Sequence, residues 1–150
     1  MINGQPIDIK PLVPKIIPLP NSGRAVNRDG DHGDSDLYDL FTDPGKGKSM
    51  PVHEGLKFLD NVEDERVFCI CFNLEAFAFI FAPKTNRNLE REYLQFFKKI
   101  EVDDLKDLKW CDLIADLLIE FIKLYKASSA KYKMCGGCLL ILVVSGVLSL

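Results

Sequence analysis

Four cysteines have spacings that could support metal or redox chemistry. Cys135 and Cys138 are separated by two glycines, the spacing of a redox pair or of half a zinc site. A zinc ion would need two more ligands, which Cys69 and Cys71 could supply if the fold brought the two pairs together. Cys69 and Cys71 also stand in an apolar run, where small buried thiols are common. We therefore expect no metal centre and no cofactor, and we keep Cys69, Cys71, Cys135 and Cys138 as zinc candidates to test against the structure.

The other motifs that suggest chemistry are incomplete. The segment Gly47-Lys48-Ser49 resembles the end of a phosphate-binding loop, but the first glycine of such a loop would stand at position 42, which is Thr42. The chain has two histidines, His32 and His53, both in or beside its N-terminal part. Because a Ser-His or Cys-His site is hard to assemble from them, we expect no catalytic residue and no small-molecule substrate.

Composition narrows the classes of partner. The chain has 150 residues, is 47% hydrophobic and carries a formal net charge of -3. A nucleic-acid-binding protein usually offers a concentrated excess of Lys and Arg, so nucleic acid is not expected as a partner. Prolines interrupt the first twenty residues and leave no apolar core for a secretory signal. The five cysteines are therefore expected to be free thiols in a reducing compartment, nuclear or cytoplasmic.

Proline, glycine and apolar residues are unevenly distributed. Residues 1–50 hold most of the proline and glycine, and little that could build a core. We expect residues 1–50 to form a disordered or loop-rich arm and residues 51–150 to form a helical fragment. The expected fold class is mainly α.

Hydrophobic spacing predicts individual helices. The longest is expected over 108–127, with Asp107 as its N-cap and Ser128 near its end, because apolar residues recur there at steps of three and four. Shorter helices are expected over 53–61 and 89–100. The run 67–82 is apolar on all sides, so its pattern fits a strand pair or a helix.

Residues 134–150 carry no charge. As a helix they would extend about 25 Å, near the lower limit for crossing a bilayer core of about 30 Å. Lysines precede the segment, as at the cytosolic side of a C-terminal anchor. A small tail-anchored membrane protein is therefore the alternative to a buried core helix at this end.

Several short segments together resemble the plant mobile domain (aminotransferase-like) family, found in transposon-derived plant proteins. They are Phe77–Thr85, Val102–Leu105, Leu108–Cys111, Leu124–Lys126 and Gly136–Leu140. The match covers Pro51–Leu142 and implies a mostly helical module, with helix over 68–82, that offers no catalytic residues. Family members would continue beyond residue 144, so the resemblance also implies a truncated copy. The function expected from it is non-enzymatic contact with a protein partner that the sequence does not name.

Overall fold

The computed structural model confirms a mainly α-helical fold. It describes residues 8–28, 35–42, 49–84, 87–97, 100–129 and 136–144. Within these ranges the chain contains isolated bridges but no β-strand. The chain divides into two compact units. Unit 1 joins residues 1–25 to residues 107–150, and unit 2 comprises residues 26–106, whereas the sequence pattern suggested a division near residue 50.

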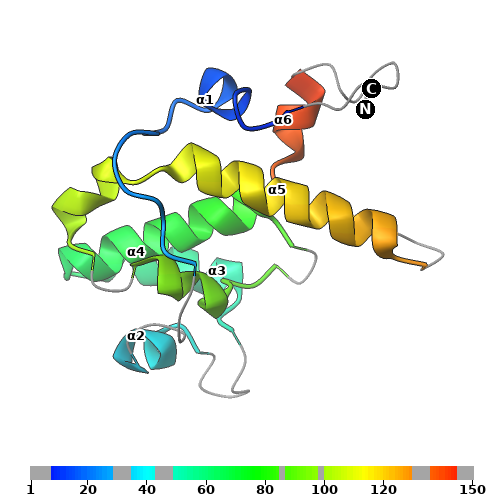
Figure 1. Cartoon of the computed structure of the whole chain (residues 1–150). Coiled ribbons are helices and arrows are strands. Elements are labelled where there is room, and N and C mark those ends of the chain that lie inside the picture. Colours follow the sequence, from blue (N-terminus) through cyan, green and yellow to red (C-terminus); the bar gives the residue numbers. More distant parts are fainter. Residues whose placement is uncertain are drawn as a thin grey trace. The chain divides into compact units, whose positions relative to one another are not determined.

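Helix α5, Trp110–Ala127, is the main element of unit 1 (Figure 1). Its amphipathic spacing buries a continuous apolar stripe that includes Ile114 and Leu118, as predicted for 108–127. Ser128 is the C-cap, also as predicted.

The prediction that Asp107 is the N-cap of α5 is wrong. Lys109 occupies the N-cap position and makes no side-chain cap hydrogen bond. The physical reason is pairing with a distant segment, because Arg24 donates its N–H to the Asp107 carbonyl and accepts a hydrogen bond from the Lys109 N–H. These bonds hold residues 107–109 in a bridge conformation and delay the start of the helix to Trp110.

Two short helices complete unit 1. Helix α1, Val13–Ile16, contacts both α5 and α6, Leu139–Val144 (Figure 1). Val13 of α1 and Ile141 of α6 are fully buried. Helix α6, which belongs to the uncharged segment 134–150, therefore contributes to the core. Residues 134, 135 and 145–150 lie outside the described residues. No helix of the described part combines the length and the apolar content needed to cross a membrane.

Gly137 lets the chain approach α5 before α6 begins. Its φ is +83°, a left-handed conformation that glycine adopts without a steric cost. A Cβ at this position would lie 3.1 Å from both Leu118 Cδ1 and Phe121 Cδ2. The glycine spacer that suggested a cysteine pair is therefore explained in part by close packing.

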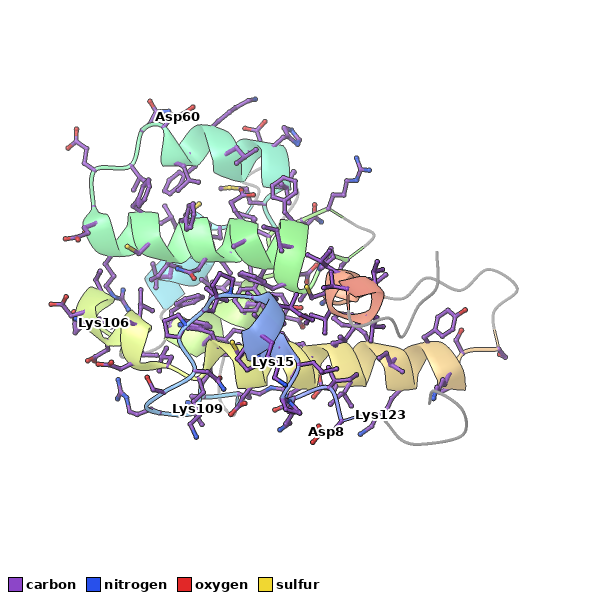
Figure 2. The ribbon with its side chains drawn as sticks, turned by 90° about the horizontal axis from the view of Figure 1, so that it is seen from above. Asp8, Lys15, Asp60, Lys106, Lys109 and Lys123 are labelled. Carbon is purple, nitrogen blue, oxygen red and sulfur yellow. The ribbon has the colours of Figure 1, made fainter. Side chains whose placement is uncertain are left out.

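Unit 2 is built on a helical hairpin formed by α3, Val52–Leu59, and α4, Glu65–Ala76 (Figure 2). Asp60, labelled in Figure 2, follows α3, and the short connector ends at Asp64. The Asp64 carboxylate accepts a hydrogen bond of 2.8 Å from the Val67 N–H and caps α4. The helix continues as a π-helical turn, η1, over Phe77–Phe81. The run 67–82 is therefore helical, as the family resemblance implied.

Three further elements complete the described structure. They are α2, Ser35–Leu40, and two 3₁₀ helices, η2, Arg91–Phe97, and η3, Val102–Asp107. The helix expected over 89–100 is found in the described residues as the 3₁₀ helix η2, which covers a shorter stretch than predicted.

The 3₁₀ geometry of η2 follows from what it buries. In a 3₁₀ helix, side chains three residues apart lie above one another. Tyr93 and Phe96 accordingly stack, with ring centroids 5.3 Å apart, and both contact Phe77 of η1. Packing against this aromatic cluster therefore compensates the poorer hydrogen-bond geometry of the 3₁₀ turn.

Candidate functional site

The structure does not assemble the four zinc candidates within the described residues. Cys69 and Cys71 lie on α4 in unit 2, Cys138 lies in unit 1, and Cys135 is outside the described residues. No group of three His, Cys, Asp or Glu side chains is arranged for a metal ion in the described part of the chain.

The pKa values of the described thiols disfavour nucleophilic attack. Burial raises the pKa of Cys69. Burial also raises the pKa of Cys138, which lies in unit 1 and is more completely buried. Burial and the nearby Glu75 carboxylate raise the pKa of Cys71 to about 12. Because the thiolate is the nucleophile, these protonated thiols favour a packing role.

Glu75 is a buried carboxyl group of unit 2 that the sequence did not reveal. It lies on α4 and is 5% exposed, and neither carboxyl oxygen has a hydrogen-bond partner among the residues that the structure describes. Gly55 of α3 makes room for it: a Cβ there would overlap Glu75 Oε1 and lie 2.6 Å from Leu89 Cδ1. Burial raises the pKa of Glu75 to about 7.

Cys71 lies one helical turn before Glu75 on the same helix. Its thiol points toward the Gly55 carbonyl, with Sγ and O 3.7 Å apart. The two side chains therefore pack against one point of α3. This arrangement can hold a proton near neutral pH, but it presents almost no surface to a ligand.

A groove opens beside this contact, between α3 and the segment that follows α4. Its volume is about 530 Å³, and its lining combines apolar and basic side chains. The lining residues are Val52, His53, Leu56, Ala78, Phe79, Pro83, Lys84 and Arg87. An apolar floor with cations and no carboxylate among these residues suits an apolar side chain accompanied by an acidic one.

The cations of the groove differ in availability. Lys84 lies 3.3 Å from Glu90 and also pairs with Glu92. Burial alone would lower the pKa of Lys84, but the two ion pairs outweigh burial and raise this pKa overall. His53 lies 3.2 Å from Glu54. The exposed Arg87 guanidinium has no ion-pair partner in the described part of the chain. Arg87 is therefore the cation best placed to meet an incoming carboxylate.

The apolar floor continues onto an exposed face of the hairpin. Phe68 and Phe72 stack on α4, with ring centroids 6.4 Å apart, and Phe79 lies further along the same helix, in the π-helical turn η1. Phe72 and Phe79 are each 57% exposed. We call this face the hairpin surface: Leu56, Phe68, Phe72, Phe79 and Ile80.

Sequence reasoning missed the hairpin surface. The available signal was that 67–82 is apolar all round, although a two-helix hairpin can bury only part of each helix. Without knowing that this run is helical, its exposed positions could not be separated from its buried ones.

Comparison with known proteins gives one family. A family model described as a domain of unknown function matches residues 1–143. No curated protein matches the chain, and no solved structure does.

Proposed function

The chain belongs to the DUF8566 family, whose description assigns no function, and from the geometry of unit 2 we propose that it is a non-enzymatic protein-contact module that acts through the hairpin surface. The observation that carries the proposal is the exposure of five large apolar side chains on one helical hairpin. Contiguous exposed apolar surface of this kind is typical of protein interaction sites. Phe72 and Phe79 supply the aromatic area that dominates binding energy at such sites.

The chemistry of the nearby polar groups supports contact rather than catalysis. The Cys71 thiol stays protonated at neutral pH, and Glu75 is nearly inaccessible. The groove beside Phe79 can accept one apolar side chain of a partner, with Arg87 at its rim. The hairpin surface therefore offers an anchor pocket within a wider apolar face.

Site-specific photo-crosslinking in living cells tests this function. A benzophenone amino acid replaces Phe72 in the full-length chain, and the matched control places it at Lys123, an exposed position on α5 labelled in Figure 2. We expect a discrete protein adduct from position 72, none from position 123, and loss of the adduct when Phe79→Glu is added. If position 72 gives no adduct, or if Phe79→Glu leaves the adduct unchanged, the proposed function is wrong.

Two expectations from the sequence stay proposals beside this one. The first is the resemblance to the plant mobile domain family, with the transposon origin that it implies. The second is a nuclear or cytoplasmic location. Neither is needed for the argument from the hairpin surface.

A further inference from the structure

We infer that the partner of the hairpin surface is a second copy of this chain, related to the first by a two-fold axis. The inference rests on the proposed function, because it names the occupant of the same surface. It is carried by how charge is distributed around the apolar stripe: one end is acidic, and the opposite end holds an available cation.

The acidic end is the connector between α3 and α4. Four exposed carboxylates lie there, and none has an ion-pair partner in the described part of the chain; they are Asp60, Glu63, Asp64 and Glu65. Arg66, the nearest cation on α4, is turned toward the Phe97 and Ile100 carbonyls, 3.5 Å from each. The connector end of the hairpin surface is therefore strongly negative.

The opposite end is the groove beyond Phe79. Arg87 is exposed there without an ion-pair partner in the described residues, and His53 and Lys84 also line the groove. Glu90 and Glu92 offset the charge of Lys84, so Arg87 is the principal cation available to a partner. Between the two ends, Phe68, Phe72 and Phe79 form the apolar stripe.

A surface with carboxylates that lack ion-pair partners in the described part of the chain at one end and an available cation at the other complements itself when two copies pair antiparallel. A two-fold axis does this, because each residue i of one copy meets residue j of the other and the reverse. With the axis between Phe72 and Phe79, close to Phe72, the two Phe72 rings lie near each other, and Phe68 of each copy approaches Phe79 of the other. Each Arg87 then faces the partner's connector carboxylates, and both exposed stripes are covered at once.

Sedimentation equilibrium of the full-length chain tests the inference directly. We expect a reversible dimer with twice the 17.0 kDa mass of the chain. Phe72→Glu, which changes a side chain near the axis in both copies, should abolish the dimer while circular dichroism shows unchanged helix content. Lys123→Glu, on α5, makes the same charge change as Arg87→Glu at an exposed position outside the hairpin surface and should leave the dimer unchanged.

A charge-reversal pair makes the test specific for this orientation. Arg87→Glu places like charges at both ends of the two-fold dimer, and Asp60→Lys with Glu63→Lys cancels the net negative charge of the connector, so each should weaken self-association roughly tenfold. Mixing the two variants restores the original charge pair at one end and removes the like-charge repulsion at the other, so a heterodimer should form more tightly than either variant homodimer.

Three results would overturn the inference: a monomer at all concentrations, a dimer insensitive to Phe72→Glu, or no recovery on mixing the reversed variants. These results leave the proposed function standing if position 72 still crosslinks to a different protein. Loss of all crosslinking at position 72 would instead reject the proposed function itself. The two failures are thus told apart by the identity of the crosslinked adduct.

Discussion

The buried Glu75 carboxyl should make the stability of this protein fall as pH rises through the neutral range. The ordinary pKa of a glutamate, 4.5, describes the unfolded chain, and burial raises the folded-state pKa of Glu75 to about 7. Below pH 4.5 the group is protonated in both states and contributes no pH dependence. Between these two pKa values the folded protein keeps the proton that the unfolded chain releases, so the free energy of unfolding falls as pH increases.

The size of the effect follows from the pKa difference. Each pKa unit corresponds to about 1.36 kcal/mol, so the cost of ionising Glu75 in the folded state reaches about 3 kcal/mol above pH 7. Solvent screening is small, because Glu75 is 5% exposed and its oxygens have no hydrogen-bond partner in the described part of the chain. Since the whole free energy of unfolding of a domain is only about 5–15 kcal/mol, the change is readily measurable.

Urea denaturation followed by far-ultraviolet circular dichroism, from pH 4.5 to pH 8, measures it. Glu75→Gln keeps the shape of the side chain but cannot ionise, so its stability relative to wild type should rise with pH by about 3 kcal/mol. Glu63→Gln, which removes an exposed carboxylate of the same unit, is the matched control and should show no such rise. If the Glu75→Gln and wild-type curves stay parallel across this range, the carboxyl is not held protonated by burial and the argument fails.

Three further predictions concern the same hairpin. Gly55→Ala should lower the free energy of unfolding by about 1–3 kcal/mol, because the added Cβ would overlap Glu75 Oε1. Urea denaturation should show a smaller loss in a Glu75→Ala background, and equal losses in both backgrounds would contradict this contact. Asp64→Ala should cost about 1 kcal/mol by removing the N-cap of α4, seen as a lower urea midpoint, and an unchanged midpoint would show that the cap contributes nothing. Iodoacetamide should alkylate Cys71 in the native protein far more slowly than Cys69, because the pKa of Cys71 is about 12 and its side chain is fully buried. Peptide mass spectrometry can measure both rates, and comparable rates would show that Cys71 is not protected by burial.

The candidate site was only partly accessible to sequence reasoning. The cysteines were visible as a pattern, but their burial and their division between α4 and unit 1 depend on the fold. Glu75 gave no signal, because a carboxylate in an apolar run can equally point outward to water. Its orientation is set by Gly55, which stands twenty residues earlier in the chain and makes room on α3 for the side chain.

The amino-acid sequence alone determined the mainly helical class, the long helix α5 and its end at Ser128. These depend on local periodicity and capping, which act within a few residues along the chain. Only the tertiary structure decided the start of α5 and the 3₁₀ form of η2. Each of these depends on contacts with residues far away in the sequence. Arg24 hydrogen-bonds to Asp107 just before α5, and the Phe77 ring contacts the Tyr93 ring of η2. The hairpin surface belongs to the second group, because an apolar residue is known to be exposed only when everything packed around it is known.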